Sequence, residues 1–432
     1  MVTMSTTISS HDPAANWDFR DADTKEGSHV IHSYPAMMIP QVARGLITRL
    51  QNQHPTAQTL LDPFCGAGTV LVEAAQHGLT AWGNDLNPLA LRIAKTRTTA
   101  IDNRVLTQEL TRLSSAITPM TFARWDGAPP DFKGREFWFK HEVSRALAFV
   151  RHMILTQITD TDVLRLCEMA FSETVRLASN TRNGEFKLYR MDASKLASFE
   201  PDVLKIFDQT LTRYAQGLRA ATPELLRAPT PVRITFGDTR TLDQIPDRFF
   251  DLMVTSPPYG DSRTTVAYGQ FSRLSLEWLG LPPEDARQVD GQLLGGRSRS
   301  VPSPNPIASA AAQEGLRAIA SQDASRAHDV EHFYRDLDQA IEAITQKLKP
   351  DALCAWVVAN RTVKGVVLPT NIIISELSQP RGYEMVETIT RNIPNKRMPL
   401  TNSPSNVPGV IGSTMRQEHL VILRYRGPMV HS

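Results

Sequence analysis

The segment that most constrains the fold runs from Thr59 to Asp85. A short apolar run, TLLD, leads into a glycine-rich turn, PFCGAG, and then into the helical pattern TVLVEAAQ. A second apolar run, TAWGND, ends in Asp85, about 20 residues after the first glycine of the turn. A strand, a glycine-rich turn, a helix and a strand that ends in an acid form a ligand-binding unit of parallel α/β sheets. The sequence therefore predicts an α/β fold with a mostly parallel sheet.

The glycine-rich turn has the chemistry of a nucleoside site. Gly66 and Gly68 allow a tight turn and a close approach of the backbone to a ligand. Asp85 stands where such a unit places the carboxylate that accepts hydrogen bonds from ribose hydroxyls. The turn lacks the third glycine of the dinucleotide fingerprint, and the chain contains no phosphate-binding Gly-Lys-Ser/Thr sequence. A nicotinamide cofactor or ATP is therefore less favoured.

A second motif, TSPPYG at 255–260, follows the apolar run FFDLMV and so should end a strand. Two successive prolines stiffen the backbone and free its carbonyl groups from sheet pairing. A rigid carbonyl and the Ser256 hydroxyl can both accept hydrogen bonds from an amino group, and Tyr259 can stack on a flat ring. Taken alone, the motif is equally compatible with an ordinary proline-rich turn.

Taken together, the motifs resemble those of the DNA amino-methyltransferase family. DPFCGAGT (62–69) is similar to that family's motif for S-adenosylmethionine. SPPY (256–259) resembles its catalytic motif in the version that begins with serine, which occurs mainly in cytosine-N4 enzymes, whereas adenine-N6 enzymes usually have Asp or Asn there. HSYPAMMIP (32–40) resembles the segment that covers the methionine end of the cofactor, and GDTR (237–240) resembles the strand end whose acid meets the adenine.

The resemblance covers residues 29–100 and about 230–425. It implies a Rossmann-like methyltransferase fold with a mostly parallel seven-stranded sheet, S-adenosylmethionine as the cofactor, and two sets of site residues. The implied catalytic residues are Ser256, Pro257, Pro258 and Tyr259. The implied cofactor-binding residues are His32, Tyr34, Pro35, Asp62, Phe64, Gly66, Gly68, Thr69, Asp85, Leu86, Asp238 and Thr239.

The mechanism that the resemblance implies uses no metal. Ser256 and the Pro257 carbonyl would accept hydrogen bonds from the exocyclic amine of a flipped-out base, with Tyr259 stacked on that base. These bonds would turn the nitrogen lone pair toward the methyl group, so that orientation supplies much of the rate. The three cysteines, Cys65, Cys167 and Cys354, are far apart without metal-ligand spacing, and their odd number argues against a disulfide framework.

The rest of the chain indicates a domain organisation. We expect a polar tail at 1–28, a catalytic domain at 29–100 and 230–432, and a largely helical insertion at 101–229. A catalytic fold of this kind offers little surface for reading DNA sequence, so we expect the insertion to be a target-recognition region. A dimerising or stabilising pack of helices is the alternative. Residues 285–330, rich in Ser, Ala, Gly and Pro, are expected to form a mobile loop within the catalytic domain.

Contacts with double-stranded DNA must come from local clusters of basic residues, because the net charge is only +2, from 47 basic and 45 acidic residues. For each such cluster, a solvated basic loop is the alternative. The candidate DNA-binding residues are Arg182, Lys187, Arg190, Arg297, Lys396 and Arg397.

The expected function is site-specific methylation of cytosine N4 in DNA, with a cognate restriction endonuclease as a candidate partner. The alternatives are an adenine-N6 DNA methyltransferase, a tRNA guanine-N2 methyltransferase and a catalytically silent DNA-binding subunit. The N-terminus has no apolar signal-peptide core, and no window reaches the roughly 18 unbroken apolar residues of a membrane span. A cytoplasmic location without membrane contact is therefore expected.

Overall fold

The computed structural model describes residues 17–182, 187–260, 266–281, 283–296, 305–393, 401–402, 412–413 and 416–428. Its centre is a seven-stranded sheet with the strand order β3-β2-β1-β4-β5-β11-β8. All neighbouring strands are parallel except β11, which is antiparallel to both of its neighbours. The predicted fold class is thus confirmed. The strands are β1 (Thr59–Asp62), β2 (Thr80–Asp85), β3 (Arg233–Phe236), β4 (Phe250–Thr255), β5 (Leu348–Val358), β8 (Tyr383–Asn392) and β11 (Gln417–Tyr425).

Two small antiparallel ribbons accompany the main sheet. One pairs β6 (Arg361–Val363) with β7 (Val366–Leu368), and the other pairs β9 (Thr401–Asn402) with β10 (Gly412–Ser413).

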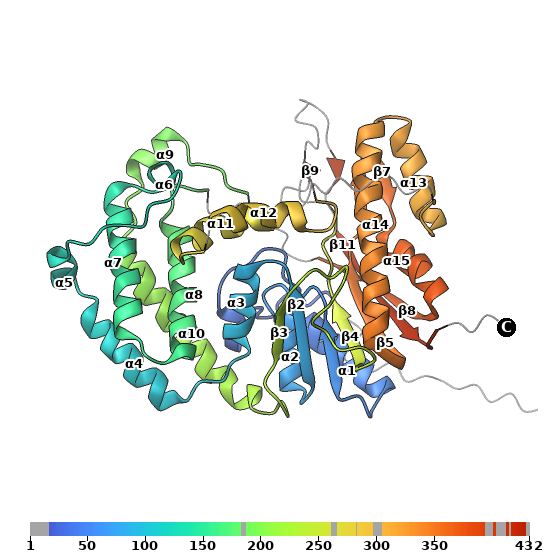
Figure 1. Ribbon diagram of the computed structural model, residues 1–432, viewed down its shortest axis with the longest axis horizontal. Helices are drawn as coiled ribbons and strands as arrows, with labels where there is room; N and C mark the ends of the chain where they lie inside the picture. The colour runs from blue at the N-terminus through green and yellow to red at the C-terminus, as the bar shows by residue number, and fades with distance from the viewer. Residues whose placement is uncertain are drawn as a thin grey trace, which may run out of the picture.

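Helices cover both faces of the sheet, which explains why its central strands are apolar at successive positions. Every residue of β1 and β4 is buried. Leu252 and Val254 of β4 point into one core with α1 (Pro40–Gln53), α2 (Thr69–Gln76) and α3 (Pro88–Arg97). Met253, between them, points into a second core with α13 (Ala310–Ala320), α14 (Ala324–Lys347) and α15 (Thr370–Ser378). Figure 1 shows these last three helices together on one side of the sheet.

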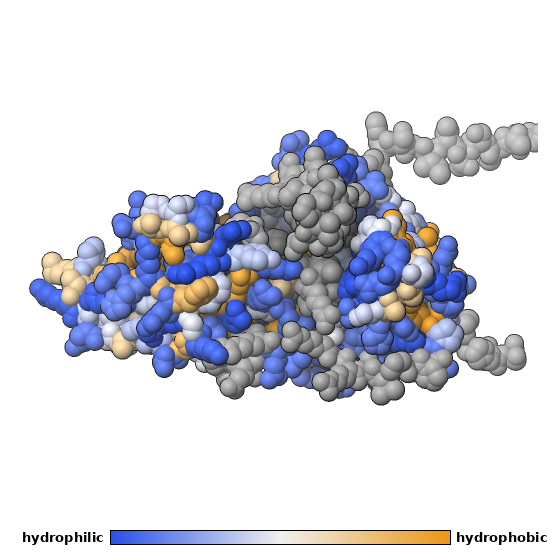
Figure 2. Space-filling model, turned by 90° about the horizontal axis from the view of Figure 1, so that it is seen from above, coloured by the Kyte–Doolittle hydropathy of each residue, from blue (hydrophilic) through white to orange (hydrophobic). Residues whose placement is uncertain are grey.

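Residues 101–229 form a helical lobe that continues the first of these cores. Its helices are α4 (Asn103–Ala116), α5 (Pro119–Arg124), α6 (Arg135–Trp138), α7 (His141–Gln157), α8 (Thr161–Ala178), α9 (Ala193–Ser198) and α10 (Val203–Leu225). Trp278, at the end of α11 (Tyr268–Trp278), is fully buried with its ring 5.5 Å from that of Phe139 and 6.2 Å from that of Phe171. The lobe projects to one side of the sheet (Figure 1), and its surface seen from above is mainly hydrophilic with scattered apolar patches (Figure 2).

The structure corrects the loop expected at 285–330. That segment contains most of α12 (Pro283–Gln292), all of α13 and the start of α14. A composition rich in alanine and serine concealed a helical pattern, in which Ala312 and Ile319 are buried on one side of α13. Ser309 starts that helix, because its hydroxyl accepts a hydrogen bond from the Ala312 N–H at 3.0 Å. Residues 297–304 lie outside the described residues.

Within the described ranges, no helix is long and apolar enough to cross a membrane.

Candidate active site

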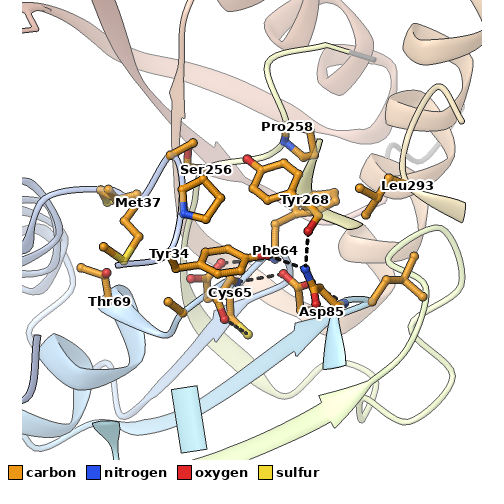
Figure 3. A pocket seen from close by; sticks show the side chains of 18 of the residues that line it. Tyr34, Met37, Phe64, Cys65, Thr69, Asp85, Ser256, Pro258, Tyr268 and Leu293 are labelled. Carbon is orange, nitrogen blue, oxygen red and sulfur yellow. Dashed lines mark hydrogen bonds between the residues drawn. The ribbon is translucent and has the colours of Figure 1, made fainter. Parts of the chain in front are cut away.

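A cavity opens at the carboxyl ends of β1, β2 and β4, where the strand order reverses between β1 and β4. This reversal is where open α/β sheets bind their ligands. The cavity encloses about 840 Å³ of space, a volume that includes open solvent at its mouth. Figure 3 shows Tyr34, Asp85 and Ser256 reaching it from three different segments. The predicted convergence of the glycine-rich turn and the serine motif at one site is therefore confirmed.

Most of the residues implied by the resemblance line this cavity. They are Tyr34, Pro35, Asp62, Phe64, Gly66, Thr69, Asp85, Leu86, Asp238, Thr239, Ser256 and Pro258. Four others do not line it, namely His32, Gly68, Pro257 and Tyr259. The sequence analysis missed several lining residues, among them Met37, Cys65, Asn87, Tyr268 and Leu293.

The glycine-rich turn is shaped by two left-handed residues with different roles. Gly66 has φ +48°, and a Cβ built on it would lie 3.8 Å from the Tyr34 ring, in the cavity wall. Gly68 has φ +80°, and its Cβ would lie 2.8 Å from that of Ala94 in α3. Gly66 therefore keeps backbone exposed to a ligand, whereas Gly68 allows α2 and α3 to pack closely.

Asp85 is fixed by the backbone on both sides of it. Its Oδ2 accepts from the Gly66 N–H at 2.9 Å, and its Oδ1 accepts from the Asn87 N–H at 2.8 Å. Burial raises the pKa of this carboxyl, and the two N–H groups oppose the rise. Because each carboxylate oxygen can accept more than one hydrogen bond, the group can also receive the hydroxyls of a sugar. With Phe64 and Leu86 as apolar neighbours, the wall suits a nucleoside-bearing cofactor such as S-adenosylmethionine.

Asp238 is engaged in an ion pair that the sequence analysis did not anticipate. The Arg240 guanidinium donates to both of its oxygens, from Nε to Oδ1 at 3.0 Å and to Oδ2 at 2.9 Å, and from Nη2 to Oδ2 at 2.6 Å. Nη1 of the same guanidinium lies 3.1 Å from Asp336 of α14. The Asp238 carboxylate therefore faces the cavity with its charge largely balanced. The signal for this contact was already present in GDTR, where the arginine stands two residues after the acid.

Asp62 lies at the bottom of the cavity and is only 3% exposed. It accepts hydrogen bonds from the Thr255 hydroxyl at 2.7 Å and from the Phe64 N–H at 3.3 Å. Burial raises its pKa to about 7, and the nearby Asp85 contributes to that rise. Asp62 therefore changes its charge near neutral pH.

One wall of the cavity is aromatic. The rings of Tyr34 and Tyr268 stack with centroids 5.8 Å apart and planes 24° apart. The Tyr34 hydroxyl accepts from Asn87 Nδ2 at 2.8 Å, and the same amide donates to Ser272 Oγ at 2.8 Å. Asn87 also caps the start of α3, because its side chain accepts a hydrogen bond from the Leu89 N–H.

His32 does not reach the cavity, contrary to the expectation of a cofactor contact. Its ring is buried against α8, with Nε2 2.9 Å from Ser172 Oγ. Burial lowers its pKa to about 4, so the ring is neutral at physiological pH. Its carbonyl accepts from the buried Arg97. His32 thus anchors the segment before Tyr34 rather than contacting a ligand.

The serine motif is connected to the far edge of the sheet. Ser256 Oγ donates to the Tyr259 hydroxyl at 3.3 Å, which donates to Glu418 Oε1 of β11 at 3.0 Å. Arg391 of β8 donates to the other oxygen of Glu418. Burial raises the pKa of Tyr259, so its hydroxyl keeps its proton. Within the motif, Pro257 is buried.

Part of the expected DNA-binding set forms one cluster on the lobe. Thr181 and Arg190 form an antiparallel bridge, and the Arg182 N–H donates to the Tyr189 carbonyl at 2.8 Å. The Arg190 guanidinium lies 4.3 Å from the centre of the exposed Phe137 ring. Arg182 and Arg190 are themselves exposed, and Lys187 is half-buried. Arg297, Lys396 and Arg397 lie outside the described residues.

This basic–aromatic cluster adjoins the cavity wall through α11. The Leu188 N–H donates to Gln270 Oε1 at 3.3 Å, and Gln270 stands two residues after Tyr268, which lines the cavity. The cluster is thus attached to the helix that supplies Tyr268 to the cavity wall.

In the part of the chain that the structure describes, no group of three or more His, Cys, Asp or Glu side chains is placed to hold a metal ion. Cys65, Cys167 and Cys354 are all buried free thiols.

Comparison with known proteins finds relatives that are described as methyltransferases. A family described as an RMKL-like methyltransferase domain matches residues 31–112. The type II methyltransferase M.MvaI of Kocuria varians is 40% identical over 422 residues, which cover 94% of this chain and 93% of that protein. The type II methyltransferase M.MjaII of Methanocaldococcus jannaschii is 33% identical over 69 residues, 16% of this chain and 12% of that protein.

Among solved structures, the rRNA methyltransferase aviRa from Streptomyces viridochromogenes aligns over 91% of this chain and 89% of its own. It does so with 14% identity and a TM-score of 0.32. The match to M.MvaI covers a similar share of both chains at a much higher identity, 40%.

Proposed function

We propose that this chain, which belongs to the type II DNA methyltransferases and uses S-adenosylmethionine, methylates the N4 amino group of cytosine at a specific site in double-stranded DNA. The observation that carries the proposal is the shared cavity. Ser256 and Pro258 line the same cavity as Gly66 and Asp85, so an amine at the serine motif would meet a cofactor held by the turn.

We propose distinct tasks for the cofactor-binding residues. Asp85 would accept hydrogen bonds from the ribose hydroxyls, and Phe64 and Leu86 would flank the adenine. Asp238, held by Arg240, would face the adenine amino group. The segment from Tyr34 to Met37 would cover the methionine end. When bound, S-adenosylmethionine supplies an electrophilic methyl group on a sulfonium.

The serine motif would bind and orient the amine. An exocyclic amine on a base is a poor nucleophile, because its lone pair is delocalised into the ring. Hydrogen bonds from the amine to Ser256 Oγ and to the Pro257 carbonyl would draw the nitrogen toward tetrahedral geometry. Serine at position 256, rather than Asp or Asn, supports cytosine N4 over adenine N6 as the target.

The cytosine must leave the duplex to enter the cavity, as it does in other enzymes that modify bases. The Tyr259 ring does not line the cavity but lies half-buried beside Ser256, so it would stack on the flipped base at the mouth of the cavity while its hydroxyl remains on Glu418. We propose that the helical lobe at 101–229 is the target-recognition region, and that Arg182, Lys187 and Arg190 contact the DNA backbone. Type II membership also supports a cytoplasmic role beside a restriction endonuclease of the same specificity.

The test is methyl transfer from tritium-labelled S-adenosylmethionine to DNA and, separately, to tRNA, followed by nucleoside analysis. We expect label in N4-methylcytosine from DNA. Label in N6-methyladenine would transfer the same mechanism to adenine, and label in N2-methylguanine from tRNA alone would refute a DNA substrate. Ser256→Ala is the matched variant, because it should abolish most transfer while calorimetry still detects cofactor binding.

A further inference from the structure

A directed chain of hydrogen bonds connects the serine motif to a carboxylate that no motif contains. It runs from Ser256 to Tyr259 and on to Glu418, which Arg391 holds from the other side. We propose that Glu418 is a positioning residue, which fixes the direction of these bonds so that Ser256 can only accept hydrogen bonds from the substrate. The proposal rests on the proposed function, because it assigns a cause to the preference of the site for an amine.

The direction follows from what each group can donate. An ionised carboxylate only accepts hydrogen bonds and an arginine only donates them. Tyr259 has one hydroxyl hydrogen, and Glu418 takes it. The tyrosine oxygen can then only accept from Ser256, whose single hydrogen is used in that bond.

Ser256 is left with lone pairs alone facing the cavity. An exocyclic amino group donates, so it finds a partner there. A base carbonyl or a bare ring nitrogen accepts, so it would face an unpaired buried acceptor, which costs binding free energy. The chain of hydrogen bonds therefore selects amino groups over carbonyl groups as well as orienting them.

The pair of Glu418 and Arg391, at the far end of these hydrogen bonds, is held firmly enough to impose this direction. Arg391 is 4% exposed, and its Nε donates to the Trp17 carbonyl at 2.8 Å. The Glu418 side chain is 16% exposed. Glu418 and Arg391 face each other across the antiparallel pair of β11 and β8, in register. Two strands of the sheet thus hold the carboxylate in place behind Tyr259.

Glu418→Gln tests the proposal, because it reverses the direction of the hydrogen bonds from Ser256 to residue 418 with almost no change in the shape of the side chain. Arg391 only donates, so the glutamine oxygen must face it and the glutamine NH₂ must face Tyr259. Tyr259 would then donate to Ser256, and the serine hydrogen would point toward the substrate amine. We expect the single-turnover rate of methyl transfer to fall about 10–100-fold, with DNA and cofactor affinity changed less than about twofold.

Tyr259→Phe tests the same connection without touching the ion pair. It leaves the Ser256 hydroxyl free to rotate, so we expect a smaller loss of rate, up to about 10-fold. Adding Glu418→Gln to Tyr259→Phe should then cost less than about twofold more, because the connection is already cut. This non-additivity is an outcome that a purely structural role for Glu418 does not produce.

Glu384→Gln is the matched control. Glu384 lies on β8, is exposed and pairs with Arg426, so the same chemical change occurs in the same sheet without contact to the motif. We expect its rate to stay within about twofold of the native rate. All variants are compared by thermal unfolding, and a misfolded Glu418→Gln would leave Tyr259→Phe as the deciding variant.

Two results would overturn the positioning role. One is an undiminished rate in folded Glu418→Gln, and the other is a full-sized additional loss in the double variant. If Glu418→Gln misfolds, Tyr259→Phe decides instead, and a native rate of methyl transfer in that variant would show that the hydrogen bond between Ser256 and Tyr259 does not matter for the reaction. A native enzyme that methylates no base in DNA would refute the proposed function itself, which is a separate outcome.

Discussion

Thr255, the last residue of β4, donates a hydrogen bond of 2.7 Å to the carboxyl of Asp62, the last residue of β1. The two residues begin the two motifs of the site, and the bond joins them at the bottom of the cavity. Because Asp62 is buried there with a pKa of about 7, its charge is a property of the assembled site rather than of the residue.

Asp62→Asn should change how stability depends on pH. The folded state raises the pKa of Asp62 from about 3.9 to about 7, so this group stabilises the fold below pH 4 and that contribution is lost as pH rises through 7. The asparagine variant lacks this loss. Without cofactor, we expect its free energy of unfolding to gain on the native protein by up to about 4 kcal/mol between pH 3 and 8, with most of the gain between pH 4 and 7. Urea denaturation across this range measures it, and parallel pH profiles would contradict it.

Asp85→Ala should weaken cofactor binding. The substitution removes a charged acceptor held by two backbone N–H groups. A hydrogen bond from a ribose hydroxyl to this carboxylate would contribute about 1.5–3 kcal/mol, so its loss should lower the affinity for S-adenosylmethionine roughly 10–150-fold. Calorimetry gives the comparison. Asp243→Ala, at an exposed position outside the cavity, should bind as the native protein does.

Gly66→Ala and Gly68→Ala should separate binding from stability. Both glycines have positive φ, so both substitutions cost on the order of 1 kcal/mol in backbone strain. Only the Gly68 methyl would meet Ala94 at 2.8 Å, whereas the Gly66 methyl would enter the cavity wall beside Tyr34. We expect the larger fall in unfolding temperature from Gly68→Ala and the larger fall in cofactor affinity from Gly66→Ala. The reverse order would be incompatible with these contacts.

Replacing Arg182, Lys187 and Arg190 together with alanine should weaken DNA binding in a salt-dependent way. Each lost phosphate contact should reduce the slope of log affinity against log salt by roughly one. Fluorescence anisotropy across a salt series measures the slope. Arg317→Ala, on α13 at the other face of the sheet, should leave it unchanged. An unchanged slope and unchanged site preference in the triple variant would leave the lobe with a structural role.

The cavity could be predicted from sequence because its parts are local. The turn at Gly66 and the motif at Ser256 each follow an apolar run, and parallel strands bring such turns to one edge of a sheet. A contact such as that between Tyr259 and Glu418 joins residues 159 positions apart. It depends on β11 inserting antiparallel beside β5, and no local pattern near either residue announces that pairing.

The expectations for His32 and for the segment around Ala312 were wrong, because they were based on motif position and on composition, which do not determine where a side chain points. His32 belongs to a segment that approaches the cavity, but its backbone has φ +63° and its ring turns back toward α8. The residues around Ala312 have the composition of a linker, yet they carry apolar side chains at helical spacing that fill the core beneath α14.

Residues 17–18 cover one end of β8 through contacts with Arg391 and Asn392. β8 is one of the two edge strands of the sheet, and an edge strand offers unpaired N–H groups to any other extended chain. Asp18 accepts the Asn392 N–H at 2.7 Å and its side-chain amide at 3.1 Å, so these donors at the end of the strand are already paired. A preparation lacking these residues should therefore be more prone to aggregate through this edge, even where the sheet itself stays intact.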